Sequence, residues 1–100
     1  MKNIIISQND YGIEIRRQFI DIRNKQPVDA TSCVGNAFIE YPDGTKVHKS
    51  VYPISNKDGI LAVMLDKEDT KDTGVHRIIM SLMNGEYYVT AQEDVYYYVK

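Results

Sequence analysis

The sequence has no tryptophan, one cysteine and three prolines among its 100 residues. A single cysteine cannot form a disulfide within the chain, so an apolar core must hold the fold. Cys33 is expected to be a small buried hydrophobe, because no helix N-terminus or paired histidine is there to stabilise its thiolate. Hydrophobic residues make up 43% of the chain. That share suffices for the core of one domain, expected over residues 1–100.

Long hydrophobic runs and an excess of one charge are also missing. The apolar stretch Ile4–Ile6 is far shorter than the roughly seven or more residues of a secretory core. No segment approaches the roughly 20 apolar residues of a membrane span. The net charge is −2, and the one adjacent basic pair, Arg16-Arg17, lies between Glu14 and Asp21 and is expected on a solvated strand face. We therefore expect no signal peptide, no membrane partner and no nucleic-acid partner.

Motifs for catalysis and metal binding do not occur either. His48 and His76 lack the close spacing of a ligand pair, and each is expected at a surface or partly buried strand position. The sequence contains no nucleophile elbow and no glycine-rich phosphate loop. The acids between Asp66 and Gly74 lack the alternation of a calcium loop, so a solvated helical turn is expected there. We predict that the protein is not an enzyme and holds no metal and no cofactor.

Glycine turns punctuate the chain instead, at Pro42-Asp43-Gly44, Asn56–Gly59 and Asn84-Gly85. Asp-Gly and Asn-Gly pairs provide the positive φ angles of tight hairpins. The runs between them are short and alternate in polarity, which indicates strands. The sequence therefore predicts an all-β fold, an antiparallel immunoglobulin-like β-sandwich of seven or eight strands with one short helical turn. A small barrel is the alternative.

The strands expected from this alternation are Asn3–Ser7, Gly12–Ile22, Cys33–Tyr41, Lys46–Tyr52, Ile60–Leu65, Val75–Met83, Tyr87–Ala91 and Val95–Val99. Within Gly12–Ile22 the apolar residues change face, which indicates a bulge or a crossing between sheets. Ile60–Leu65 is apolar on both faces and is expected to be a central strand. Asp66 is expected to cap a helical turn over Asp66–Thr73. The expected core residues are Ile13, Ile15, Ile39, Val63, Ile78, Met80, Tyr97 and Val99.

Tyrosine is abundant, with eight residues. Tyr97 shares a face with Val95 and Val99 and is expected in the core, so Tyr96 and Tyr98 point outward. There they cover the sheet, contact a protein partner or stack on a sugar. Ile4 and Ile6 are the second candidate contact, since their strand carries no charge that would protect its edge from pairing with another chain. The alternative is that this strand pairs within its own sheet.

Several segments taken together resemble a known protein family. They are Asp10-Tyr11-Gly12, Phe19-Ile20-Asp21, Phe38–Thr45, Asp58-Gly59-Ile60, and Leu65–Thr70 closed by Gly74. In this order they resemble the immunoglobulin-like N-terminal domain of upper baseplate proteins in tailed phages of Gram-positive hosts. The resemblance implies a structural part of the virion, made in the host cytoplasm, that docks onto other virion proteins as a baseplate or tail adaptor within a larger, oligomeric assembly.

One departure from that family keeps other functions in view. The family's domain is followed by a helical or fibre-forming region, whereas this sequence ends at Lys100. A capsid decoration protein or a head-fibre anchor is therefore the first alternative. A carbohydrate-binding module that uses Tyr96 and Tyr98 is the second, and a small enzyme of unrecognised type is the third. The resemblance carries no catalytic residues over to this sequence.

Overall fold

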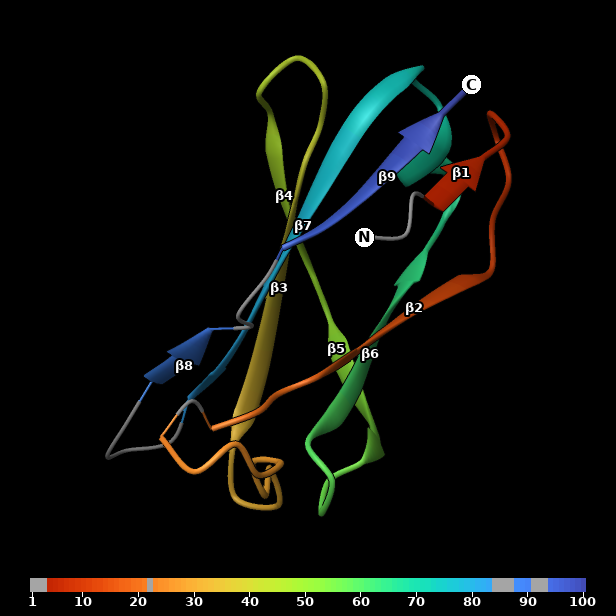
Figure 1. Cartoon of the computed structure of the whole chain (residues 1–100). Helices are drawn as coiled ribbons and strands as arrows, with labels where there is room; N and C mark the ends of the chain where they lie inside the picture. Colours follow the sequence, from red (N-terminus) through yellow and green to blue (C-terminus); the bar gives the residue numbers. More distant parts are fainter. Residues whose placement is uncertain (1–3, 22, 84–87, 91–93) are drawn as a thin grey trace.

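A computed structural model describes residues 4–21, 23–83, 88–90 and 94–100. Nine strands and one short 3-10 helix lie in these ranges (Figure 1). The strands are β1 (Ile4–Ile6), β2 (Ile13–Gln18), β3 (Val34–Glu40), β4 (Lys46–Lys49), β5 (Val51–Ser55), β6 (Ile60–Leu65), β7 (Gly74–Met83), β8 (Tyr88–Thr90) and β9 (Val95–Val99). The 3-10 helix η1 (Lys67–Thr70) connects β6 to β7. In these ranges no helix has the length and apolar character needed to span a membrane.

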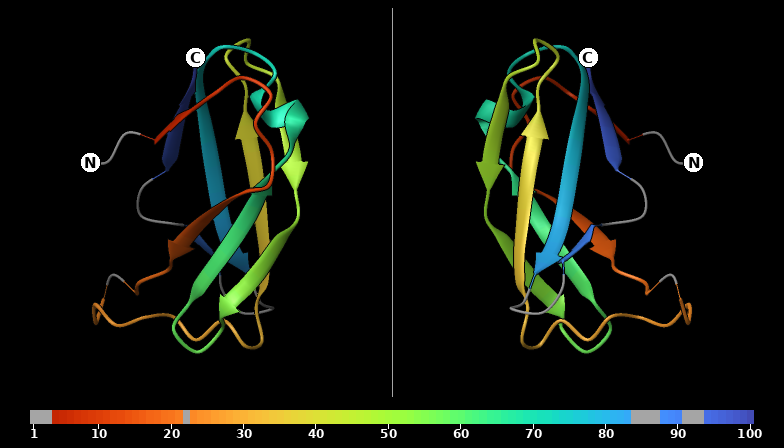
Figure 2. Two further views of the ribbon diagram at one scale, coloured as in Figure 1. Left: turned by 90° about the vertical axis from the view of Figure 1, so that its right-hand side faces the viewer. Right: turned by 90° about the vertical axis from the view of Figure 1, so that its left-hand side faces the viewer.

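The strands form two sheets that pack face to face (Figure 2). The larger sheet has the order β1-β9-β7-β3-β4, and β8 pairs with β7 beyond the end of β9. The smaller sheet has the order β2-β6-β5, so Ile60–Leu65 is its central strand, as predicted. The predicted β-sandwich is confirmed. One pairing differs from the expected antiparallel pattern, because β1 runs parallel to β9 with Ile4 opposite Tyr97.

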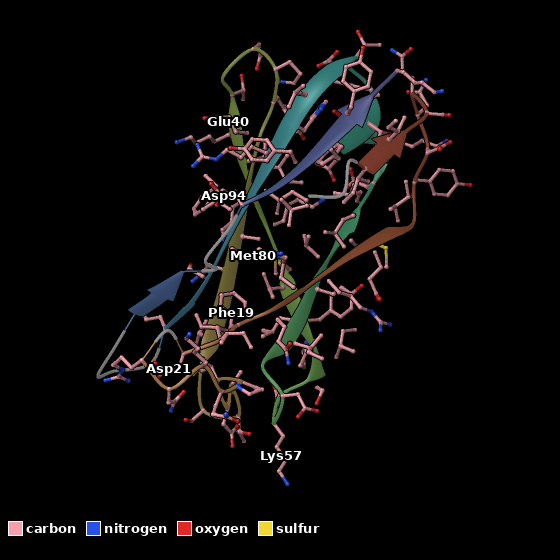
Figure 3. The ribbon with its side chains drawn as sticks, viewed as in Figure 1. Phe19, Asp21, Glu40, Lys57, Met80 and Asp94 are labelled. Atoms are coloured by element: carbon pink, nitrogen blue, oxygen red, sulfur yellow. The ribbon has the colours of Figure 1, made fainter. Side chains whose placement is uncertain are left out.

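The core lies between the two sheets and is built from alternate residues of each strand, as the sequence pattern predicts. The expected core residues Ile15, Ile39, Val63, Ile78, Met80, Tyr97 and Val99 are all buried. Ile13 and Cys33 are only partly buried and pack against the edge of the core. Met80 extends from β7 into the space between the sheets, where Figure 3 shows it.

The chain crosses from the larger sheet to the smaller sheet at Ser50. β4 pairs with β3 in the larger sheet, and β5 pairs with β6 in the smaller sheet, with only this residue between them. The single strand predicted for Lys46–Tyr52 is therefore two strands. Val47 and Val51 both pack against the core, so the side-chain pattern continues through the crossing and conceals it.

The strand predicted for Gly12–Ile22 is shorter than expected, because β2 ends at Gln18. Phe19 then keeps the inward face of β2, with only 1% of its surface exposed. Its amide donates to the carbonyl of Gly59, and its own carbonyl accepts from the amide of Val28. Ile20 forms an isolated bridge with Pro27, so the chain turns back here and does not cross between the sheets. Ile22 and the predicted Asn84-Gly85 turn lie outside the described residues.

The predicted helical turn after β6 is present as η1. The Asp66 carboxylate accepts from the amide of Glu68, and the Asp69 carboxylate accepts from the amide of Asp66, which makes a reciprocal capping box. Gly74 begins β7 with a φ of 122°. The expectation of a solvated turn is met by residues 66–68 and 71–73, which are exposed, but it was wrong for Asp69 and Thr70, which are buried.

Two turn glycines adopt positive φ angles in different surroundings. Gly44 has a φ of 90° and Gly59 a φ of 66°. A Cβ atom added to Gly44 would meet nothing within 4 Å, whereas one added to Gly59 would lie 2.5 Å from the Val28 carbonyl oxygen and 2.9 Å from the Phe19 carbonyl oxygen. The backbone of Phe19 and Val28, at the two ends of the loop after β2, therefore packs directly against Gly59.

We predict that Gly59→Ala destabilises the protein much more than Gly44→Ala. Both substitutions place alanine in the left-handed region, at a cost of about 1–2 kcal/mol. Only Gly59→Ala also pushes backbone atoms apart, so its loss of unfolding free energy should exceed that of Gly44→Ala by at least about 1 kcal/mol. Urea denaturation of both variants measures the difference. Equal losses would contradict the packing described around Gly59.

Candidate partner-binding surface

A buried carboxylate anchors one end of the sandwich. Asp69 in η1 is 1% exposed. Its Oδ2 atom accepts from Lys49 Nζ at 2.7 Å, and its Oδ1 atom accepts from the Tyr41 hydroxyl at 2.9 Å. Its backbone carbonyl accepts from the Tyr97 hydroxyl at 2.7 Å. Asp69 lies in the connection between the two sheets. It thus ties this connection to β4 through Lys49, to the end of β3 through Tyr41, and to β9 through Tyr97.

A stack of aromatic rings continues from this carboxylate along the core. The His76 ring stacks on the Tyr97 ring with centroids 4.5 Å apart, and Tyr41 approaches His76 edge-on at 5.6 Å. His76 is 1% exposed, so the expectation of a surface or partly buried histidine was wrong for this residue. It takes an inward position of β7, where the stack and a contact to the Gly74 carbonyl accommodate its polar ring. His48 is exposed, as expected.

These contacts shift several pKa values. Burial lowers the pKa of His76, and the Gly74 carbonyl with the carboxylates of Asp72 and Asp69 only partly opposes that shift. Burial alone would lower the pKa of Lys49, yet its hydrogen bonds to Asp69 and Asp66 raise it above its ordinary value. Burial also raises the pKa of the Tyr97 hydroxyl far above its usual range. Neutral His76 and Tyr97 and a charged Lys49 are therefore favoured around neutral pH.

Anchoring of Tyr97 fixes which residues of β9 reach solvent. Because Tyr97 and Val99 face the core, Tyr96 and Tyr98 lie on the opposite side of the larger sheet, as predicted from the sequence. They are 45% and 46% exposed. We call this side of the larger sheet the outer face.

Exposed hydrophobic side chains are concentrated on the outer face. Nine large hydrophobic side chains are exposed in the described part of the chain. Seven of them lie on outward positions of the larger sheet, and these are Ile5, Val34, Phe38, Val75, Met83, Tyr96 and Tyr98. Ile5, Tyr98 and Val75 are direct neighbours across β1, β9 and β7. Phe38 follows on β3, opposite Ile79 and against the edge of the His48 ring.

The charged groups of the outer face are arranged in pairs. Arg77 on β7 binds Asp94, which precedes β9, with 2.6 Å between Nη2 of the arginine and Oδ2 of the aspartate. The Nζ atom of Lys46 on β4 lies 3.9 Å from the Oε2 atom of Glu40 on β3. Figure 3 shows Glu40 and Asp94 on the same side of the ribbon. Among the described residues of these strands, the outward charges therefore cancel.

The outer surface of the smaller sheet has a different character. Glu14 binds Arg16 on the same strand and accepts from the Tyr52 hydroxyl at 2.6 Å. Met64 is the exposed large hydrophobic side chain of this surface, at 41%. Three side chains of this surface thus bind one another, and it has fewer exposed large hydrophobic side chains, so the outer face of the larger sheet is the stronger candidate for contacts with a partner.

The predicted contact residues Ile4 and Ile6 lie in β1, at the end of the larger sheet. β1 pairs within its own sheet, and the side chain of Ile6 is buried while that of Ile4 is half-buried. A contact through this strand would therefore use its backbone and the exposed Ile5. The Ile6 carbonyl accepts from the Lys100 amide on the β9 side, so the polar backbone groups of Ile5 point away from β9.

Sequence reasoning missed five members of this surface, which are Ile5, Val34, Phe38, Val75 and Met83. The signal was available, because strict alternation places Ile5 opposite to Ile4 and Ile6, and Val75 opposite to His76. What the alternation cannot tell is that these positions come together on one sheet.

In the described part of the chain, no three His, Cys, Asp or Glu side chains gather as metal ligands would. The prediction of no metal site stays a prediction.

Comparison with known proteins shows a shared fold. No protein-family model and no curated protein matches the sequence. Among solved structures, the chain is similar to the N-terminal domain of ORF48 from phage TP901-1, with a TM-score of 0.67 and 14% identity. The alignment covers 99% of this chain and 85% of that domain's chain. At this identity the likeness concerns the fold.

We predict that Asp69→Asn is far more destabilising than Asp66→Asn. An asparagine in place of Asp69 would keep the shape of the side chain but lose the charge that binds Lys49 in the interior, and breaking a buried pair costs on the order of 3 kcal/mol. The Asp66 side chain is 61% exposed, and asparagine still caps a helix, so this change should cost less than about 1 kcal/mol. Chemical denaturation measures both values. Similar losses would show that Asp69 is not the anchor.

We also predict that His76 makes stability depend on pH. Its pKa in the folded protein lies below its unfolded value of about 6.5, so the unfolded chain takes up the proton first. This contribution is complete above about pH 6.5 and is lost as the pH falls towards the folded pKa. The unfolding free energy should be lower at about pH 5.5 than at about pH 7.5, and the His76 contribution to this decline should be no more than about 1.4 kcal/mol per pH unit. His76→Phe should flatten this decline, and the control His48→Asn should retain it.

Proposed function

We propose that this protein is a non-enzymatic structural component of a tailed-phage virion, where it docks onto other virion proteins as a baseplate or tail adaptor. The observation that carries the proposal is the fold likeness to a domain of a phage protein, which extends over 99% of the chain. The turn and strand motifs that resemble phage upper baseplate proteins support it independently. Docking of this kind requires an exposed apolar surface or a strand edge.

Docking onto the virion partner is assigned to the outer edge of β1. This strand ends its sheet, and in the described residues no other strand pairs with its far side. Ile4–Ile6 contains no charged side chain and no proline, the devices that normally protect an edge. The backbone groups of Ile5 point outward and provide a donor and an acceptor for an added strand.

Two alternatives remain, one at the edge of β1 and one on the outer face. A capsid decoration protein or head-fibre anchor would dock in the same way on another virion protein. A carbohydrate-binding module is favoured by one observation, the two exposed tyrosine rings at Tyr96 and Tyr98. On a glycan array, binding of a defined sugar that Tyr96→Ala abolishes would replace the proposed function with this alternative.

The proposal is tested with the proteins encoded by the genes that flank this one. We expect tail, baseplate or capsid genes there, and co-elution of this chain with at least one product in size-exclusion chromatography. Ile5→Pro removes the outward donor but none of the β1–β9 hydrogen bonds, so it should weaken the complex at least about 10-fold. The control Ile5→Val keeps the donor and should bind normally. Flanking genes for unrelated metabolism, with no complex formed, would refute the proposal.

A further inference from the structure

The outer face of the larger sheet is more apolar than a surface exposed to water alone would be. Its seven exposed hydrophobic side chains lie on β1, β9, β7 and β3. At the exposures observed, between 42% and 61%, they present on the order of 700 Å² of surface. A stable interface buries about 800 Å² of polar and apolar surface together on each partner. The outer face therefore has the size of an interface.

The charges of the outer face indicate which partner fits. Arg77 is neutralised by Asp94, and Lys46 by Glu40. A surface with an excess of one charge would need a partner of opposite charge and would repel its own copy. This surface has no such excess in its described strands. It is therefore compatible with an identical surface, and its three exposed aromatic side chains, Phe38, Tyr96 and Tyr98, are of the type that anchors interfaces.

We propose that the outer face is a homotypic interface, through which two copies of this chain pack their larger sheets face to face around a twofold axis. Sheets packed in this way lie about 10 Å apart, with the side chains of the two faces interdigitated. Each copy contributes the same surface, as in other twofold dimers. The inference rests on the outer face alone and does not depend on the proposed function. The outer edge of β1 lies at the margin of this interface and is still accessible to a third chain.

The first test is the mass of the wild-type protein in solution. In sedimentation velocity over a series of concentrations, the protein should approach twice the chain mass of 11.5 kDa. In methyl NMR over the same series, the signals of Val75 and Met83 on the outer face should shift with concentration. The signal of Met64 on the opposite sheet should not. A monomer at every concentration, or shifts confined to Met64, would overturn the proposal.

The second test uses matched charge substitutions. Val75→Lys and Tyr98→Lys each place a charge within the proposed interface, and each should weaken dimerisation at least about 10-fold. Met64→Lys introduces the same charge at a similarly exposed methionine outside it and should leave dimerisation unchanged. Circular dichroism checks that each variant is folded. If a variant is unfolded, the NMR series of the wild-type protein tests the proposed interface in its place. Equal weakening by all three variants, or by none of them, would refute the assignment.

Discussion

The buried carboxylate of Asp69 is the interaction on which one end of this sandwich depends. It lies in η1, the connection between the two sheets, and it binds Lys49 and Tyr41 through its side chain and Tyr97 through its backbone. The next residue, Thr70, donates to the Asp10 carbonyl, so the loop between β1 and β2 is held at the same place. A carboxylate this deeply buried is tolerated only with such partners, and a chain that fails to assemble them leaves a charge unpaired in the core.

This anchoring links the interior of the protein to its surface. Tyr97 is held by the Asp69 carbonyl and by the His76 ring, so β9 cannot slip by one residue without exposing a buried tyrosine. The same constraint fixes Tyr96 and Tyr98 on the outer face. β1 pairs with β9 and is placed by it, which brings Ile5 beside Tyr98. The positions of Ile5, Tyr96 and Tyr98 on the outer face thus depend on the polar cluster behind them.

The outer surfaces of the two sheets differ in character. The smaller sheet covers its outer surface with the Glu14, Arg16 and Tyr52 side chains, which bind one another. The larger sheet leaves aromatic and aliphatic side chains exposed and pairs its charges off. A protein that only needed to stay soluble would gain from polar residues on both surfaces. The two outer surfaces therefore differ, with exposed apolar side chains on the larger sheet and hydrogen-bonded polar side chains on the smaller one.

Most of the strands could be predicted from the sequence, because alternation and Asp-Gly turns are local signals. Ile60–Leu65 was recognised as central, the turn capped by Asp66 was placed correctly, and the outward direction of Tyr96 and Tyr98 followed from Tyr97 and Val99. Which strands share a sheet could not be predicted, since the crossing at Ser50 leaves the side-chain pattern of Val47 and Val51 unchanged. Burial of Asp69 and His76 was likewise hidden, because their partners Lys49, Tyr41 and Tyr97 are distant in the chain. For the same reason the residues of the outer face could be named as outward one by one, but their union into one surface depends on long-range strand pairing that no local pattern encodes.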